Sequence, residues 1–240
     1  MKNGRKQLVF DLASSASLGF ENFFVSESNN LAAQGIKKWK FWTNRKLILL
    51  GPKASGKSHL ANSWALESDA VLVSSRDLLS RDFIDLGKNK ALIIENIDEM
   101  LGRVIDQQNS IEEALFHLFN SLSQSSCYLL ITATLPVKSW SLRIPDLISR
   151  LKSCEKIELM PPDDRLLMAV MLKQFEDKQI SASPELIAFA SKRIRRTFES
   201  VRKFVTMIDE LTLREKREVT IPVATFVLDE LDEIEKDTKF

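Results

Sequence analysis

Short apolar runs alternate with helical patterns over the first two thirds of the chain. In the helical patterns, apolar residues recur every three or four positions, which is the spacing of one helix face. The run Ala91-Leu92-Ile93-Ile94 is apolar throughout, as expected of a strand that is covered on both faces. The alternation predicts an α/β fold in which helices cover both faces of a parallel sheet. Strands are predicted at 46–50, 70–74, 91–95, 128–132 and 155–159, and helices at 57–67, 75–84, 109–124 and 144–151.

The pattern changes after Pro161-Pro162, beyond which it is almost entirely helical. We therefore expect three parts: an N-terminal arm at 1–19, an α/β domain at 20–160 and a small helical lid domain at 161–240. The acidic end at 229–237 is interpreted as a solvated helix face or a frayed tail. Further helices are predicted at 29–38, 163–178, 183–193, 197–216 and 222–231, with a short β-type piece at 219–221.

Composition narrows the class of protein. The 240 residues are 44% hydrophobic and 28% charged, which is ordinary for a globular protein, and the net charge of +1 predicts no general attraction to nucleic acid or to a membrane surface. The sequence has neither an apolar run long enough to span a membrane nor a signal-peptide core at its N-terminus. Cys127 and Cys154 adjoin apolar runs and are interpreted as reduced core residues of a cytoplasmic protein. With His59 and His117 as the only histidines, a histidine-based metal site or catalytic triad is not expected.

A phosphate-binding motif lies between the first strand and the helix that follows it. Residues 51–58 fit the pattern G-x-x-x-x-G-K-[ST], and this strand–loop–helix context favours a P-loop over a surface turn with an incidental lysine. In such a loop, backbone N–H groups and the helix N-terminus surround the phosphates. Lys57 would reach the β- and γ-phosphates, and the hydroxyl of Ser58 would bind Mg²⁺. The predicted nucleotide-binding residues here are Gly51, Pro52, Lys53, Ala54, Ser55, Gly56, Lys57, Ser58 and His59.

Candidate catalytic groups follow two other strands. Glu95 ends an apolar run, and we interpret it as a Mg²⁺-shell acid, the alternative being a partly buried carboxylate without a catalytic role. Asn96 takes the place of a water-polarising acid, and since an amide cannot accept a proton in this way we expect weak intrinsic hydrolysis. Asp98 lies outside the apolar run and is expected to be exposed. Thr132 or Thr134 either bonds the γ-phosphate or a water, or simply ends its strand.

Arg150 lies near the end of the predicted helix at 144–151. An arginine supplied in trans to a neighbour's γ-phosphate is a known route to hydrolysis. A surface salt bridge is the alternative interpretation of this residue.

Taken together, these segments resemble the AAA+ ATPase module of the DnaA family of replication initiators. The segment from Phe20 to Ala32 is similar to the one with which that family forms its adenine pocket, so the resemblance implies that Phe23 and Val25 line this pocket. The resemblance extends over about 20–231 and implies an AAA+ fold that binds ADP or ATP with Mg²⁺. It also makes Arg150 the leading candidate for an arginine finger in trans.

Three features differ from DnaA itself. The chain ends after the predicted lid, so we expect no helix-turn-helix DNA-binding domain, and the stretch at 75–90, where DnaA carries a DNA-contacting insertion, is short. The N-terminus also contains a peptide that resembles the motif by which replication proteins bind the sliding clamp. Gln7 would bond at the mouth of the clamp groove and Leu8, Phe10 and Leu12 would fill apolar pockets, the alternative being an edge strand.

This combination resembles the Hda-type members of the family, which act in the regulatory inactivation of DnaA. The resemblance implies a nucleotide-bound adaptor that binds the DNA-loaded sliding clamp and stimulates hydrolysis of ATP on DnaA. Its own ATPase activity would be weak, DNA would be contacted through the clamp, a homo-oligomer is possible, and no membrane is involved. Two alternatives stay open: a DnaC-like helicase loader that acts on its own nucleotide, and a DnaA-like DNA-binding protein.

The predicted lid departs from the family pattern. Matching Lys192 to Glu199 to the family's lid helix puts Glu199 at the position of the arginine that senses the nucleotide. A glutamate there would repel phosphates. Arg195 or Arg196 is the replacement that the sequence offers.

Overall fold

The computed structural model describes residues 20, 23–80, 83–102, 105–215 and 218–237. The predicted clamp-binding residues Gln7, Leu8, Phe10 and Leu12 lie outside this part of the chain, as does the rest of the arm at 1–19.

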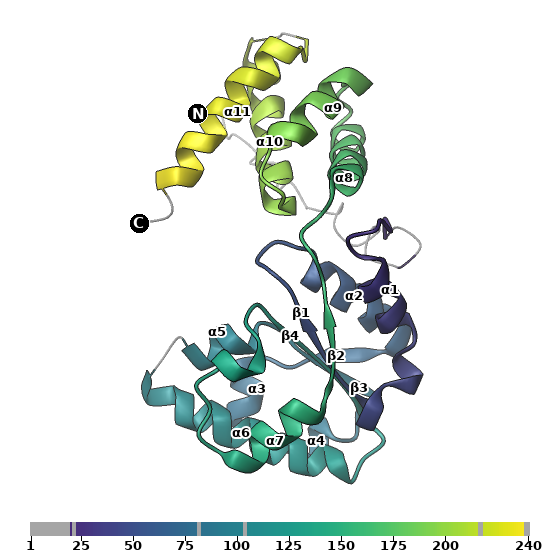
Figure 1. Cartoon of the computed structure of the whole chain (residues 1–240), viewed down its shortest axis with the longest axis vertical. Helices are drawn as coiled ribbons and strands as arrows, with labels where there is room; N and C mark the ends of the chain where they lie inside the picture. Colours follow the sequence, from purple (N-terminus) through teal and green to yellow (C-terminus); the bar gives the residue numbers. More distant parts are fainter. Residues whose placement is uncertain (1–19, 21–22, 81–82, 103–104, 216–217, 238–240) are drawn as a thin grey trace, which may run out of the picture.

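A five-stranded parallel sheet forms the centre of the α/β part (Figure 1), and its strand order is β2-β3-β4-β1-β5. The P-loop strand therefore lies between β4 and β5, where its carboxyl end is flanked by the ends of both neighbours. This confirms the predicted parallel sheet. The strands are β1 Lys46–Leu50, β2 Ala70–Leu72, β3 Ala91–Ile94, β4 Tyr128–Ala133 and β5 Glu155–Glu158.

Successive residues of each strand point to opposite faces of the sheet, and each face has its own apolar cluster. On one face Leu47 and Leu49 pack with α1 (Asn30–Lys37) and α2 (Lys57–Ser68). On the other face Ile48 packs with the remaining helices of the α/β part. Those helices are α3 Ser75–Ser80, α4 Phe83–Leu86, α5 Ile97–Gly102, α6 Ile105–Ser123 and α7 Pro145–Ser153, and short 3-10 turns cover Trp39–Phe41, Thr43–Arg45 and Val137–Ser139.

Four helices form a separate body above the carboxyl ends of the strands (Figure 1): α8 Asp164–Asp177, α9 Pro184–Arg193, α10 Phe198–Glu215 and α11 Ile221–Asp237. Their core consists of side chains from these helices, among them Met171, Phe175 and Phe204. The side chains of Asp163 and Ser183 accept hydrogen bonds from the N–H groups of Leu166 and Leu186, so α8 and α9 begin with side-chain caps. We call this body the lid.

The structure differs from the predictions at two elements and decides between two interpretations of a third. Helix α5 was not predicted; it is short, and Ile97 and Leu101, four residues apart, bury its apolar face. Residues 219–221 do not form a strand, because Ile221 already begins α11. Of the two interpretations of the acidic end, the solvated helix face holds and the frayed tail does not, since α11 continues to Asp237 with Asp229, Glu230 and Glu233 exposed; Glu235, only 8% exposed, is the exception. No described helix combines the length and the apolar character needed to cross a membrane.

Candidate nucleotide site

The loop between β1 and α2 needs glycine at two positions. A Cβ at Gly51 would lie 2.6 Å from the carbonyl oxygen of Leu159, so any side chain there would collide with backbone. Gly56 has φ +100°, and a Cβ there would lie 2.8 Å from the ring of Phe198 in the lid. The backbone N–H of Phe198 also donates to the carbonyl of Ala54 at 3.1 Å. The P-loop and the start of α10 are therefore in direct contact.

Lys57 is held inside the P-loop. Its side chain is buried, and Nζ donates to the carbonyl oxygens of Gly51 at 2.7 Å and Pro52 at 2.8 Å. Burial lowers the pKa of Lys57, and the negative charges of Asp98, Glu99 and Glu95 oppose this shift. The ammonium group thus has carbonyl partners that a phosphate oxygen could replace.

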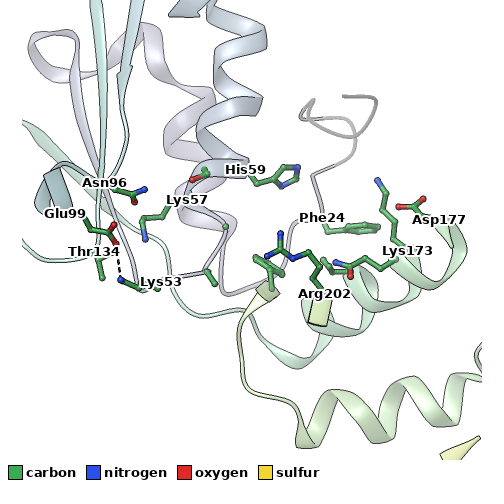
Figure 2. Close-up of a pocket in the computed structure, with 16 residues that line it drawn as sticks. Phe24, Lys53, Lys57, His59, Asn96, Glu99, Thr134, Lys173, Asp177 and Arg202 are labelled. Atoms are coloured by element: carbon green, nitrogen blue, oxygen red, sulfur yellow. Dashed lines mark ion pairs between the residues drawn. The ribbon is translucent and has the colours of Figure 1, made fainter. Parts of the chain in front are cut away.

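A cavity of about 780 Å³ lies between the P-loop and the lid. Its size is that of a typical small-molecule site. In Figure 2, Lys53 and Lys57 border it from the α/β part, and Lys173 and Arg202 border it from the lid. The lining residues are Phe24, Lys53, Ala54, Gly56, Lys57, Ser58, His59, Asn96, Glu99, Thr134, Val170, Lys173, Gln174, Asp177, Phe198 and Arg202.

The predicted P-loop residues divide between lining the cavity and shaping the loop. Lys53, Ala54, Gly56, Lys57, Ser58 and His59 line it, whereas Gly51, Pro52 and Ser55 do not. In the described part of the chain, the buried hydroxyl oxygen of Ser55 has no hydrogen-bond partner.

The residues that follow β3 and β4 are held by more hydrogen bonds than the sequence suggested. Asn96 has φ +51°, and its N–H donates to the hydroxyl of Thr132 at 3.0 Å, so Thr132 supports the backbone after β3. Of the two candidate threonines, Thr134 is the one that lines the cavity. Asp98 was expected to be exposed, but its carboxylate accepts the N–H groups of Thr134 at 2.9 Å and Leu135 at 2.8 Å.

Glu95 lies beside the cavity rather than in its lining. It borders a smaller hollow together with Asn96 and Glu99, both of which also line the main cavity. The buried Oε1 of Glu95 and Oδ1 of Asp98 have no hydrogen-bond partner among the residues that the structure describes. Buried unpaired acceptors of this kind suit a hydrated cation, since Mg²⁺ takes oxygen ligands and keeps several waters. The residues present therefore fit a magnesium-bound polyphosphate, with Ser58 and Glu95 on the metal side.

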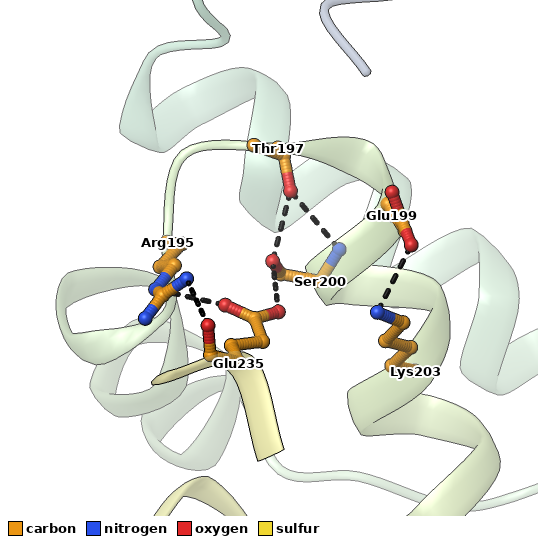
Figure 3. A network of polar contacts seen from close by, with 6 residues as sticks. All are labelled: Arg195, Thr197, Glu199, Ser200, Lys203 and Glu235. Carbon is orange, nitrogen blue, oxygen red and sulfur yellow. Dashed lines mark hydrogen bonds and ion pairs between the residues drawn. The ribbon is translucent and has the colours of Figure 1, made fainter. Parts of the chain in front are cut away.

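The lid arginines separate into two groups. Arg195 forms an ion pair with Glu235 at 2.8 Å, which also accepts a hydrogen bond from Ser200 at 2.7 Å (Figure 3). Arg196 pairs with Asp164 at 2.9 Å. Neither arginine lines the cavity, whereas Arg202, which lies within α10, does.

Glu199 is also turned away from the cavity lining. Its carboxylate pairs with Lys203 at 2.9 Å along α10, and this hydrogen bond together with the charge of Lys203 lowers the pKa of Glu199. The glutamate at the family's arginine position is therefore neutralised locally, and Arg202 supplies the positive charge on the cavity side.

The aromatic side of the site involves Phe24 directly and Phe23 indirectly. Phe24 lines the cavity, while Phe23 stacks on His59 with ring centroids 5.4 Å apart. Val25 is 54% exposed and is not among the lining residues.

Several lining residues were not singled out from the sequence, among them Phe24, Lys173, Asp177 and Phe198. The lid residues in particular carry no motif of their own, so spacing along the chain offers no signal for them.

Arg150 lies at the other end of the sheet. It is on α7, which Figure 1 shows far from the lid, and it borders a hollow together with Lys46 at the start of β1. Its Nε pairs with Asp146 at 3.0 Å, one turn earlier in the helix. The buried carboxylate of Glu112 on α6 accepts the N–H groups of Arg143 at 2.6 Å and Ile144 at 2.7 Å, and so fixes the entry into α7. Arg150 cannot reach the phosphate site of its own chain.

Comparisons with known proteins identify the fold. No family model matches the chain. An uncharacterized protein of Haemophilus influenzae is 25% identical over 234 residues, which are 93% of this chain and 98% of that protein. The replication initiator DnaA of Cutibacterium acnes is 22% identical over 234 residues, 88% of this chain and 46% of that protein. Domain III of Thermotoga maritima DnaA superposes with a TM-score of 0.74 at 20% identity, covering 90% of this chain and 97% of that one.

The chain is similar in sequence to DnaA proteins and has the fold of DnaA domain III. It spans about half the length of the DnaA proteins that it matches. Another similar structure is that of a DnaA bound to AMPPCP and single-stranded DNA, with a TM-score of 0.68 at 16% identity over 86% of this chain and 70% of that one. The DnaA-like AAA+ fold, with its 2-3-4-1-5 strand order and C-terminal helices, confirms the predicted fold class.

Proposed function

We propose that this DnaA-like AAA+ protein binds ADP or ATP with Mg²⁺ and acts in the control of replication initiation. The observation that carries the first half is the cavity between P-loop and lid, in which Lys57, Ser58 and Arg202 converge. The second half is supported by the similarity to DnaA over most of the chain.

The roles of the site residues follow from their charge and place. The phosphates would lie along the N-terminus of α2, with Lys57 exchanging its carbonyl partners for phosphate oxygens. Arg202 and Lys173 would approach the same anion from the lid. Phe24 and the Phe23–His59 stack would border the base.

The chain's own hydrolysis would be slow. Asn96 is held with its N–H bonded to Thr132, and an amide in this place does not act as a general base. Slow hydrolysis favours the role of a nucleotide-bound adaptor over that of a motor.

Arg150 is the group with which the adaptor would act on another protein. It lies on the surface at the opposite end of the sheet from its own phosphate site, so it can serve a nucleotide only in a neighbouring subunit. In the Hda-like reading that subunit is DnaA carrying ATP, and the N-terminal peptide with Gln7, Leu8, Phe10 and Leu12 tethers the chain to the sliding clamp on DNA. An arginine finger in trans accelerates hydrolysis by about 10³–10⁵-fold where it is well placed.

The test is hydrolysis of labelled ATP on DnaA, mixed with this chain, ADP and clamp loaded on DNA. We expect acceleration that requires the clamp and falls by at least about tenfold in Arg150→Ala. Lys152→Ala, an exposed residue on the same helix, is the matched control and should keep the acceleration. Gln7→Ala/Leu8→Ala should abolish the dependence on the clamp.

No acceleration by the wild-type chain, with DnaA and clamp shown to be active, would reject the adaptor proposal. Rapid hydrolysis by the chain alone would then favour a helicase-loader type of ATPase.

A further inference from the structure

A second cavity, of about 260 Å³, lies at the start of β1, at the opposite end of this strand from the P-loop. Three cationic side chains line it: Arg45 and Lys46 from the beginning of the strand and Arg150 from α7. Two segments that are distant in the sequence, 45–46 and α7, thus bring positive charge to one hollow.

The charge in this hollow is poorly balanced. Among the described residues that line it there is no aspartate or glutamate. Burial lowers the pKa of Lys46; negative charge on Cys154 or Cys127 would raise it, and the charges of Arg150 and Arg45 lower it further. The nearby thiols do not compensate, because burial raises the pKa of Cys127 and Cys154 to about 11 and keeps them neutral at physiological pH. Asp146 pairs with Arg150 only through Nε.

The backbone directly before Lys46 has an uncommon conformation. Asn44 and Arg45 have φ +53° and +56°, which is unfavourable for residues other than glycine. Consecutive residues in the left-handed region persist only where the surroundings impose them, and they are concentrated at functional sites.

Neighbouring groups hold both side chains in place. The guanidinium of Arg45 lies 6.0 Å from the ring centre of Tyr128, and Nζ of Lys46 lies 5.9 Å from that of Phe119. Lys46 also donates to the carbonyl of Asn44 at 3.2 Å. Lys46 is therefore pre-positioned beside Phe119 at the hollow, whereas Arg45 is exposed at its rim and packs on Tyr128.

We propose that this cavity binds a phosphate group through Arg45, Lys46 and Arg150. A doubly charged oxyanion would balance the excess positive charge, and arginine can bind it in bidentate fashion. The phosphate has two possible sources: a free phosphate or pyrophosphate ion, or the terminal phosphate of a nucleotide held by a partner subunit. The second source rests on the proposed function, in which Arg150 acts in trans, and it adds Arg45 and Lys46 to that contact.

The first arm of the test is a titration of the isolated chain with pyrophosphate, followed by ¹⁵N-resolved NMR. Signals of residues 44–46 and 150–154 report this cavity, and signals of 51–59 report the P-loop, so binding at the two sites is measured separately. We expect saturable shifts at 44–46 that weaken by about tenfold in Lys46→Met and in Arg45→Ala. Lys138→Ala, an exposed lysine outside the cavity, should bind like the wild type.

Lys46→Met also separates a binding role from a structural one. The substitution keeps the apolar stem of the side chain and removes the charge. The charge of Lys46 is desolvated and lies near two other cations. Its removal should therefore raise the thermal unfolding midpoint while weakening the binding of the anion. If Lys46 served only to stabilise the fold, Lys46→Met would lower the midpoint.

The second arm is the DnaA hydrolysis assay with the same variants. If pyrophosphate does not shift 44–46 but Lys46→Met and Arg45→Ala reduce acceleration of hydrolysis about tenfold, the phosphate comes from the partner's nucleotide and the proposal holds. If neither arm depends on Lys46 and Arg45, the proposal is overturned. Should the wild-type chain fail to accelerate hydrolysis at all, the proposed function fails and the titration alone decides the phosphate site.

Discussion

At the scale of single residues, the site depends on backbone positions that only a few residue types tolerate. Gly56 is the clearest case, since it combines φ +100° with contact to the ring of Phe198. Asn96 is another, with φ +51° and its N–H bonded to Thr132. These positions bring the P-loop, the end of β3 and the lid together. Substitutions there should therefore affect the site more than the small size of these side chains suggests.

Replacing Gly56 by alanine should damage both stability and nucleotide binding. A left-handed conformation costs an L-residue roughly 1–2 kcal/mol, and the new Cβ would also displace Phe198. The measurement is urea unfolding together with an ADP affinity. Gly102→Ala is the matched control, because nothing lies within 4 Å of a Cβ there, and it should leave both nearly unchanged. Equal effects of the two variants would contradict this account of Gly56.

At the scale of elements, helix ends and helix contacts place the functional side chains. Glu112 on α6 fixes the entry to α7 and thereby the position of Arg150. Glu235 on α11 is bonded to Arg195 and Ser200 and ties the C-terminal helix to the loop in front of α10 (Figure 3). That loop carries Phe198 onto the P-loop, so α11 supports the nucleotide site without lining it.

Asp163, the N-cap of α8, leads to a prediction about pH dependence. Burial raises its pKa, but the hydrogen bonds from Leu166 and from Ser26 and Ser28 outweigh burial, and the pKa of Asp163 in the folded protein is lowered. Its stabilisation is therefore present above the unfolded pKa of about 3.9 and is lost as pH falls through the lower, folded pKa. Asp163→Ala should cost about 1 kcal/mol at pH 7, as loss of an N-cap does.

The free energy of unfolding of wild type and Asp163→Ala, measured from pH 7 downward, checks this. The difference between them should shrink below about pH 4. Asp163→Asn keeps a capping acceptor without a titratable group, so its stability at pH 7 should lie close to that of the wild type. A gap that stays constant as the acid is protonated would reject the cap as its origin.

At the scale of the whole molecule, the nucleotide cavity belongs to neither part alone. Lys57 and Thr134 line it from the α/β part, and Lys173 and Arg202 line it from the lid. Each part has its own apolar core. A ligand in this cavity should therefore couple two bodies that are packed separately.

ADP with Mg²⁺ should stabilise both parts together. At a ligand concentration of 100 times Kd, binding adds about 2.7 kcal/mol to the free energy of unfolding, and the thermal midpoint should rise accordingly. Amide hydrogen exchange should slow in α8 and α10 as well as in α2. Lys57→Met should abolish both effects. Protection restricted to the α/β part would show that the lid does not take part in binding.

Local patterns in the sequence determined most of the secondary structure and half of the site. The P-loop, the five parallel strands and the lid helices were predictable because each depends on residues close together in the chain, namely apolar spacing, glycines and caps. What only the tertiary structure decided are relations between distant residues. It placed Arg202 rather than Arg195 or Arg196 at the cavity, buried Glu235 in the lid, and brought Arg45, Lys46 and Arg150 to one hollow. Such relations depend on how helices and strands pack, and no spacing along the chain encodes the side of a helix that will face a neighbour.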